Sequence, residues 1–242
     1  MGNLPSPAFA PRRLSSAQRK ELQDKLGMDC MQFYNFGVCG ETGAGKSTLV
    51  NAVCGYQEGD PSAAAVGHIG GGTRHARAYK PAKYPRVAIW DMPGTNHPDN
   101  PMNTYFSDQK LCAFDLLFIV SSTVRFTEVD AKLALRAQRE GVPVIFIRTQ
   151  ADATIHNAYE RAVRSAAVEN AANRRTIAKE VRKDLYKAIV KELNNIGMAN
   201  VLLFIVTAFA FYEQYDPELY PELDKEQLLD RIEALAETRG RK

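Results

Sequence analysis

Hydrophobic and polar positions along the chain follow two alternating patterns. Short, nearly continuous apolar runs predict strands buried on both faces, and stretches with apolar residues at helical spacing lie between them. The predicted strands are residues 33–39, 86–90, 116–120, 142–148 and 201–206. The predicted helices are residues 15–26, 46–54, 129–140 and 225–237, with a long helical region at 157–196. This alternation predicts an α/β fold with a mostly parallel sheet flanked by helices.

The boundaries of the predicted domain follow from the same pattern. Residues 1–13 contain three prolines and two arginines and predict an extended lead-in. Ser15 and Gln18 have the spacing of a capping box, which favours a helix start. We therefore expect a tail and one helix over residues 1–30, and one domain over residues 31–240. Within that domain, the Gly-, Ser- and Ala-rich residues 56–73 predict a long loop.

The strongest chemical signal is the pattern G-x-x-x-x-G-K-[ST] between a predicted strand and a predicted helix. Glycines let successive backbone N–H groups point inward and form an anion site at a helix start. Lys46 would neutralise the β- and γ-phosphates, and the Ser47 hydroxyl would bind Mg²⁺. The expected nucleotide-binding residues here are Gly40, Glu41, Thr42, Gly43, Ala44, Gly45, Lys46, Ser47 and Thr48.

Two further motifs predict the metal and the γ-phosphate contacts. Asp91 ends a hydrophobic strand and starts the sequence D-M-P-G, where phosphate-loop proteins place the acid that holds Mg²⁺ and its waters. Gly94 can then offer its N–H to the γ-phosphate without a side chain in the way. Thr73 is the sole Ser or Thr between Ser62 and Trp90, and its hydroxyl is the candidate third Mg²⁺ group. The predicted metal residues are Ser47, Thr73 and Asp91.

A fourth motif predicts which base is bound. Thr149-Gln150-Ala151-Asp152 follows a predicted strand, where GTPases have their T/N-K-x-D sequence. A carboxylate at Asp152 can accept hydrogen bonds from the guanine N1–H and the N2 amino group, which adenine lacks. Gln150 stands where lysine is usual, so we expect weaker base binding with the selectivity kept. The prediction is a GTP- or GDP-binding protein with Mg²⁺.

Composition narrows the classes of function. The net charge of +3 gives no general case for nucleic-acid binding. The sequence contains no run of about 18 apolar residues, so we expect no membrane span. The four cysteines lack metal or disulfide spacing, which is typical of a cytoplasmic protein. Gly2 lies in the pattern M-G-x-x-x-[ST] for N-myristoylation, although Pro7 weakens the match. Lipidation at Gly2 and a peripheral membrane contact stay open alternatives.

With these landmarks in order, the chain resembles the immunity-related (interferon-inducible) GTPases, which are dynamin-like phosphate-loop proteins. The matching stretches are residues 40–51, 90–94, 103–105, 114–115, 121–126 and 146–152. The resemblance implies GTP hydrolysis across a dimer formed through the nucleotide face, with action on membranes in immune defence. It also implies base contacts from Thr207 and Ala208 after the last strand. Glu41 joins Lys46 and Thr73 as a candidate catalytic group, because the family's matching glutamate faces the partner.

The chain also departs from the family pattern. The family's helical domain is mostly missing from this sequence, and no Asp or Glu lies between Thr73 and Trp90. Thr95 follows Gly94 where Ras-like enzymes have glutamine, so the group that activates water is unassigned. A slowly hydrolysing GTPase is the first hypothesis. A guanine-nucleotide-binding module without hydrolysis is the second, and a phosphate-loop kinase or ATPase, which would have no use for Asp152, is the third.

Overall fold

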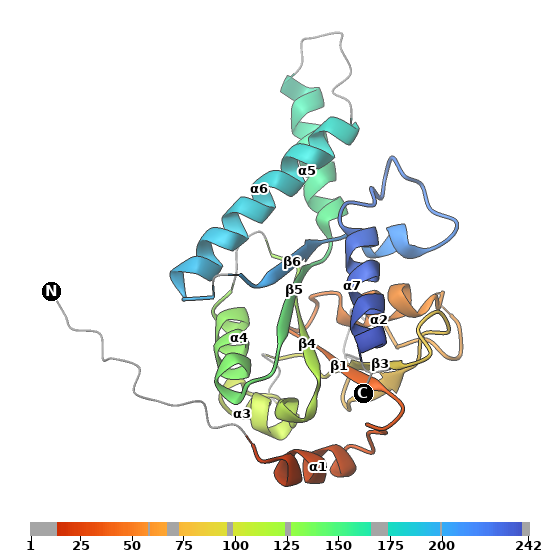
Figure 1. Ribbon diagram of the computed structural model, residues 1–242. Coiled ribbons are helices and arrows are strands. Elements are labelled where there is room, and N and C mark those ends of the chain that lie inside the picture. Colours follow the sequence, from red (N-terminus) through yellow and green to blue (C-terminus); the bar gives the residue numbers. More distant parts are fainter. Residues whose placement is uncertain are drawn as a thin grey trace, which may run out of the picture.

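The computed structural model describes residues 14–57, 59–66, 73–95, 99–123, 127–165, 174–198 and 200–238. Its centre is a six-stranded sheet in the order β2-β3-β1-β4-β5-β6 (Figure 1). All neighbouring strands are parallel except β2, which pairs antiparallel with β3. The strands are β1 (Tyr34–Cys39), β2 (Arg77–Tyr79), β3 (Val87–Asp91), β4 (Leu116–Ser121), β5 (Val144–Arg148) and β6 (Leu202–Ile205). The predicted fold class is confirmed.

Helices cover both faces of the sheet. The α-helices are α1 (Ser16–Lys25), α2 (Lys46–Cys54), α3 (Met102–Asp108), α4 (Glu128–Glu140), α5 (Ala151–Ser165), α6 (Arg174–Asn195) and α7 (Lys225–Thr238). Short 3₁₀ turns are η1 (Leu111–Ala113) and η2 (Ala208–Phe211). One core cluster joins the sheet to α3, α4 and α6, and a second joins it to α2 and α7. The sheet is therefore buried on both faces, as its apolar strands predict.

The strand order of the sheet reverses at β1. From β1 the chain crosses to β3 on one side, and it then returns to place β4 on the other side of β1. Open parallel sheets bind ligands outside the strand ends at such a reversal of strand order. The loop after β1 starts at this point, so the phosphate motif lies where the topology favours a ligand.

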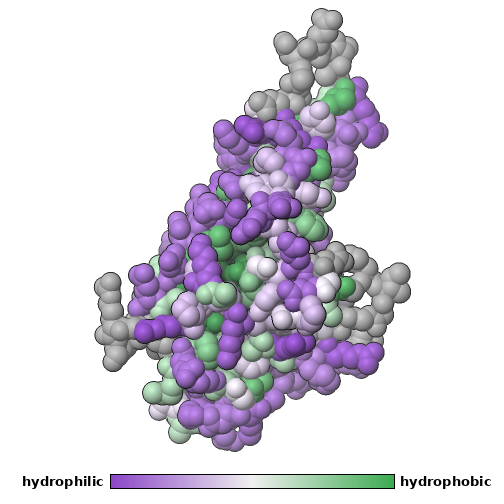
Figure 2. All heavy atoms as spheres, turned by 90° about the vertical axis from the view of Figure 1, so that its right-hand side faces the viewer, coloured by the Kyte–Doolittle hydropathy of each residue, from purple (hydrophilic) through white to green (hydrophobic). Residues whose placement is uncertain are grey.

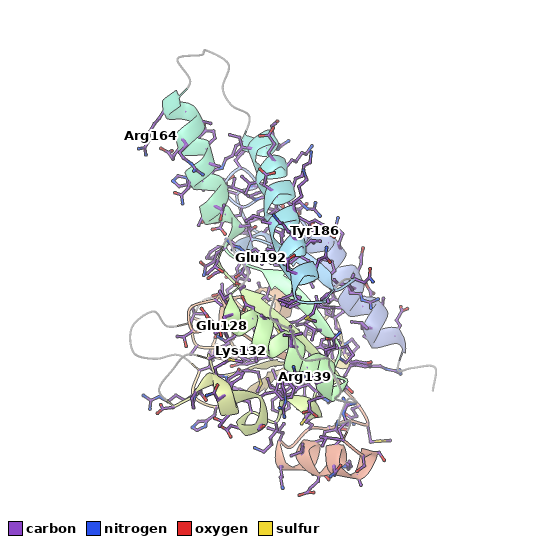
Figure 3. The ribbon with its side chains drawn as sticks, turned by 90° about the vertical axis from the view of Figure 1, so that its left-hand side faces the viewer. Glu128, Lys132, Arg139, Arg164, Tyr186 and Glu192 are labelled. Atoms are coloured by element: carbon purple, nitrogen blue, oxygen red, sulfur yellow. The ribbon has the colours of Figure 1, made fainter. Side chains whose placement is uncertain are left out.

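Local sequence signals fix several helix ends. The capping box predicted at Ser15 and Gln18 is present, and a second one joins Thr127 to Asp130 at the start of α4. Gly141 ends α4 in the left-handed conformation, which costs glycine little. On the outer side of α4, the Glu128 carboxylate and the Lys132 ammonium form a 2.8 Å ion pair one helical turn apart (Figure 3).

The long helical region predicted at 157–196 is wrong as a single element. Helix α5 starts at Ala151, six residues earlier than predicted, and ends at Ser165, while α6 begins at Arg174 and runs back beside it (Figure 1). Ile155 on α5 and Leu185 on α6 share a small core cluster. Each helix carries its own apolar stripe, so the periodicity continues through the reversal and does not reveal it.

Outside the sheet, three further features bear on the predictions: the N-terminal segment, the cysteines and the surface. The segment with Gly2 lies outside the described residues. No described helix is both long and apolar enough to cross a membrane. The four cysteines are free thiols, two of them buried. On the face drawn in Figure 2, hydrophilic side chains cover most of the surface, including the projecting helices.

Candidate nucleotide site

The phosphate loop connects β1 to α2 with a backbone that only glycine adopts readily. Gly40, Gly43 and Gly45 have φ angles of 144°, 82° and 83°, in the region that other residues avoid. A side chain at Gly40 would also collide with the carbonyl of Val120 on the neighbouring strand β4. The loop therefore curls against the strand ends and presents its backbone at the start of α2, the arrangement that binds phosphate.

Lys46, the first residue of α2, is held inside this loop. Its side chain is 6% exposed, and its ammonium donates a 2.8 Å hydrogen bond to the Glu41 carbonyl. Burial lowers the pKa of Lys46, while the charge of Asp91 opposes that shift. A polyphosphate would supply the negative charge that this buried cation lacks.

Ser47, Thr73 and Asp91 converge from three separate segments. Asp91 Oδ2 accepts hydrogen bonds from Ser47 Oγ at 2.7 Å and from Thr73 Oγ1 at 2.6 Å. The two hydroxyl oxygens are 3.3 Å apart. Asp91 Oδ1 is buried with no hydrogen-bond partner among the described residues. Two hydroxyls around a carboxylate with an unsatisfied oxygen are a donor set that fits Mg²⁺ and its waters.

Burial has an electrostatic consequence for Asp91. Its side chain is 1% exposed, and burial raises the pKa of the carboxyl. Hydrogen bonds from Thr73 and Ser47 and the charge of Lys46 oppose that rise without cancelling it. The carboxylate is thus under-compensated within the protein, and a divalent cation would stabilise its charged form.

The D-M-P-G segment lies directly against the phosphate loop. The Thr42 N–H donates to the Thr95 carbonyl at 3.2 Å, and the Thr95 N–H donates to the Gly40 carbonyl at 3.1 Å. A Cβ atom at Gly94 would approach the Cα of Thr42 to 2.9 Å. Only glycine therefore fits between the two loops, which brings the Gly94 backbone to the place where the sequence predicts a γ-phosphate contact.

The residues after β5 are tied to the same loop. Thr149 Oγ1 donates to the Ala44 carbonyl at 2.6 Å, and Gln150 Nε2 donates to the Gly43 carbonyl at 3.1 Å. Gln150 has a φ of 52°, so its backbone is in the left-handed region. The glutamine amide thus joins the segment after β5 to the phosphate loop. Hydrogen bonds therefore join the predicted base-reading segment to the predicted phosphate loop.

We expect Gln150→Ala to weaken GDP binding about fivefold, because it removes one hydrogen bond between the two halves of the site. Gln150→Lys, which keeps a donor, should bind GDP within about twofold of the unmodified protein. Calorimetric titration with GDP and Mg²⁺ measures both. The matched control is Gln214→Ala at an exposed position. Unchanged GDP affinity in Gln150→Ala would contradict a role for this contact.

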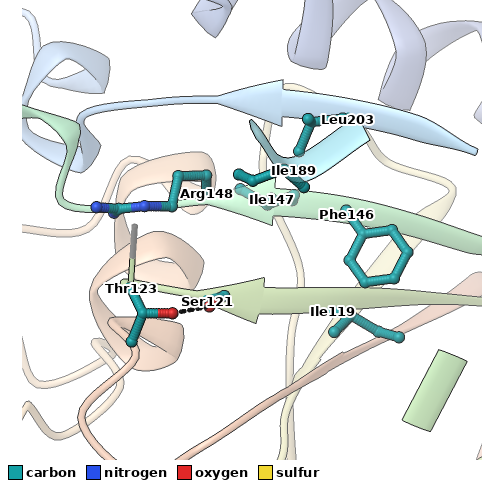
Figure 4. A pocket seen from close by; sticks show the side chains of 8 residues that line it. All are labelled: Ile119, Ser121, Thr123, Phe146, Ile147, Arg148, Ile189 and Leu203. Atoms are coloured by element: carbon teal, nitrogen blue, oxygen red, sulfur yellow. Dashed lines mark hydrogen bonds between the residues drawn. The ribbon is translucent and has the colours of Figure 1, made fainter. Parts of the chain in front are cut away.

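Asp152 lies in the first turn of α5, two residues after Gln150. Burial raises the pKa of its carboxyl, and the backbone N–H groups of Asp152 and Ala153 and the charge of Arg148 oppose that rise. Arg148 is 2% exposed and donates a 3.1 Å hydrogen bond to Thr154 Oγ1. In Figure 4 its stem borders a small cavity, and its guanidinium reaches the strand ends near Thr123. A buried cation thus supports the ionised form of Asp152.

The remaining predicted residues are placed as follows. The Thr207 side chain is fully buried, and its hydroxyl donates to the Pro221 carbonyl at 2.8 Å, while Ala208 is 7% exposed. This leaves backbone groups of Thr207 and Ala208 as the candidates for a base contact. Thr48 lies in the first turn of α2, and Glu41 is part-exposed at the mouth of the loop.

One residue of the site was not assigned a role from the sequence. Tyr105 on α3 is fully buried, and its hydroxyl donates a 2.6 Å hydrogen bond to the Pro93 carbonyl inside the D-M-P-G segment. Tyr105 belongs to a matched stretch, but residue pattern alone does not reveal this contact. The signal that could have found it is the presence of a tyrosine one turn into α3, the helix that follows the D-M-P-G segment.

Comparison with known proteins identifies the family. Residues 20–238 match the interferon-inducible GTPase (IIGP) family. The chain belongs to this family. Interferon-gamma-inducible GTPase 10 of Mus musculus is 32% identical over 200 residues, which cover 83% of this chain and 44% of that protein. T-cell-specific guanine nucleotide triphosphate-binding protein 2 of Mus musculus is 37% identical over 123 residues, covering 51% of this chain and 29% of that protein.

A solved structure supports the fold of this interferon-inducible GTPase family member. Toc33 from Arabidopsis thaliana, crystallised with Mg²⁺ and GMPPNP, has a TM-score of 0.50 and 15% identity. The match covers 93% of this chain and 91% of that one. At this identity the likeness shows the fold alone. The chain spans less than half the length of the two mouse relatives described above.

Proposed function

We propose that this protein binds guanine nucleotide with Mg²⁺ and hydrolyses GTP when two copies meet through their nucleotide faces. The observation that carries the proposal is the convergence of Ser47, Thr73 and Asp91 beside the buried Lys46. Three chain segments supply these groups, and the base motif is tied to the same loop. Such a set serves a ligand that carries phosphate and a divalent cation.

Each residue has a role in this proposal. The glycine-rich backbone and Lys46 would hold the phosphates, while Ser47, Thr73 and Asp91 would hold Mg²⁺, directly or through water. Bound Mg²⁺ would supply neutralisation of the charge that develops between the β- and γ-phosphates. Asp152 would select guanine, and Gln150 would pack beside the base while it holds the phosphate loop.

We infer dimerisation because the described residues offer no evident group that would orient the attacking water. Thr95 follows Gly94, and its hydroxyl is fully buried without a hydrogen-bond partner among the described residues. Glu41 is the acid nearest to Lys46 along the loop and is part-exposed. In this proposal the nucleotide face of a second copy completes the site, as the resemblance to the family implies.

The test is phosphate release from GTP as a function of protein concentration. We expect the rate per molecule to rise with concentration, because a dimer is the active species. Glu41→Ala should abolish this rise, whereas the exposed control Glu237→Ala should keep it. A measurable rate that is strictly proportional to protein concentration would contradict activation by dimerisation.

The second candidate function is a guanine-nucleotide-binding module without hydrolysis. The buried Thr95 hydroxyl and the lack of acids between Thr73 and Trp90 favour it. Nucleotide binding with no phosphate release at any concentration would support this candidate. A peripheral membrane contact stays a prediction, for which the basic side chains of α5 and α6 offer the candidate surface.

A further inference from the structure

The Tyr105 hydroxyl contacts the one peptide group that the proposed site uses to sense a γ-phosphate. Its partner is the carbonyl of Pro93, at 2.6 Å. That carbonyl and the N–H of Gly94 belong to the same planar peptide group. In a trans peptide the two point in opposite directions, so a hydrogen bond to the oxygen fixes where the N–H points. Tyr105 therefore acts on Gly94 from the far side of the peptide.

The surroundings of this peptide leave it little freedom. Tyr105 is fully buried and belongs to the core cluster that joins α3 and α4 to the sheet. On the other side, Gly94 lies so close to Thr42 that no side chain fits between them. The Pro93–Gly94 peptide is thus held between helix α3 and the phosphate loop. Burial holds the pKa of the Tyr105 phenol well above its usual range, so the hydroxyl remains a neutral donor.

The hydrogen bond also changes the peptide electronically. A donor on the carbonyl oxygen polarises the amide and makes its N–H a stronger donor, because hydrogen bonds in a chain strengthen one another. A phosphate oxygen is an ionised acceptor, for which donor strength and direction matter most. GDP has no γ-phosphate, so this contact distinguishes a triphosphate from a diphosphate.

We propose that Tyr105 is a positioning residue that aims the Gly94 N–H at the γ-phosphate and thereby gives the site its preference for triphosphate over diphosphate. The proposal rests on the proposed nucleotide site and adds a residue to it. The proposal also links α3 to the nucleotide. A shift of Gly94 toward the γ-phosphate would move the Pro93 carbonyl, which is hydrogen-bonded to a buried side chain of that helix.

The test compares GMPPNP and GDP binding, each with Mg²⁺, in the full chain and in Tyr105→Phe. The phenylalanine ring preserves the packing and removes only the hydroxyl. We expect GMPPNP affinity to fall about tenfold, with GDP affinity unchanged within about twofold. Tyr84→Phe is the matched control, because Tyr84 is 3% exposed in the core cluster on the other face of the sheet. It should alter neither affinity.

The outcomes separate this proposal from the function on which it rests. If the unmodified protein binds neither nucleotide, the proposed function itself fails. If it binds both and Tyr105→Phe has the same ratio of GMPPNP to GDP affinity, Tyr105 does not position Gly94. An equal loss for both nucleotides indicates a merely structural residue and also overturns the proposal.

A measurement on the unmodified protein covers the case in which Tyr105→Phe does not fold. The buried Tyr105 hydroxyl proton should be visible by NMR, because it is hydrogen-bonded and shielded from water. Its chemical shift should differ between the GMPPNP and GDP complexes, since the peptide that it contacts changes its hydrogen bonding. The same shift in both complexes would contradict the proposal.

Discussion

Asp152→Asn is expected to weaken GTP binding about a hundredfold and to make xanthosine triphosphate the preferred ligand. The carboxylate of Asp152 would accept hydrogen bonds from the guanine N1–H and amino group. An asparagine amide turns one acceptor into a donor, which opposes the guanine amino group and matches the xanthine oxygen. Sites that hydrogen-bond a substrate group discriminate strongly, because the wrong partner leaves buried polar atoms unpaired.

Competition between GTP and XTP for labelled GDP measures this change. The buried Arg148 strengthens this expectation. Burial raises the pKa of Asp152, and the positive charge of Arg148 opposes that rise. Asparagine removes the anion that this cation faces, so the loss of GTP affinity should exceed that of a neutral contact. Asp216→Asn at an exposed position after η2 is the matched control. If GTP still outcompetes XTP in Asp152→Asn, Asp152 does not read the base.

The sequence predicts the parts of this molecule whose chemistry is local. Gly40, Gly43 and Gly45 have fixed spacing because each must adopt a backbone that other residues avoid. The apolar runs of β4 and β5 mark buried strands because burial on both faces leaves no polar position. The capping box at α1 was predictable because the cap and the helix are adjacent in the chain.

Other features depend on contacts between distant segments. Strand β2 has only three residues, and it pairs with β3 through backbone atoms that leave no pattern in the side chains. Helix α3 has no side-chain cap and is short, so it was not predicted. The Tyr105 hydrogen bond to Pro93 and the Gln150 hydrogen bond to Gly43 form only when the sheet has assembled. Residue spacing cannot encode where such side chains reach.

Asp91→Asn is expected to have opposite effects on nucleotide binding and on stability. Binding of GMPPNP with Mg²⁺ should weaken about a hundredfold, because the site loses the charge that holds the metal and its waters. Without nucleotide, the same variant should be more stable. The raised pKa of Asp91 means that its ionised form is disfavoured in the folded protein even after the contributions of Thr73, Ser47 and Lys46. Asparagine keeps the shape and removes that charge.

The stability effect of Asp91→Asn should depend on pH. The folded protein holds the Asp91 proton more tightly than the unfolded chain, so the destabilisation by the carboxylate is absent below the ordinary aspartate pKa. It develops as the pH rises through the raised pKa of the folded state and is complete above it. The stabilisation by Asp91→Asn should therefore be larger at pH 7.5 than at pH 4.5.

Thermal unfolding without Mg²⁺ or nucleotide measures the stability effect. We expect Asp91→Asn to raise the free energy of unfolding by about 1 kcal/mol at pH 7.5, which corresponds to a rise in Tm of roughly 2–4 °C for a domain of this size. Asp230→Asn, an exposed position on α7, should change neither Tm nor binding.

A fall in Tm for Asp91→Asn would show that the carboxylate stabilises the free protein. In that case its burial serves the fold, and the functional assignment would have to stand on the binding measurement alone. A rise in Tm together with lost binding would mean that the fold tolerates an unfavourable charge at the position where a cation is needed.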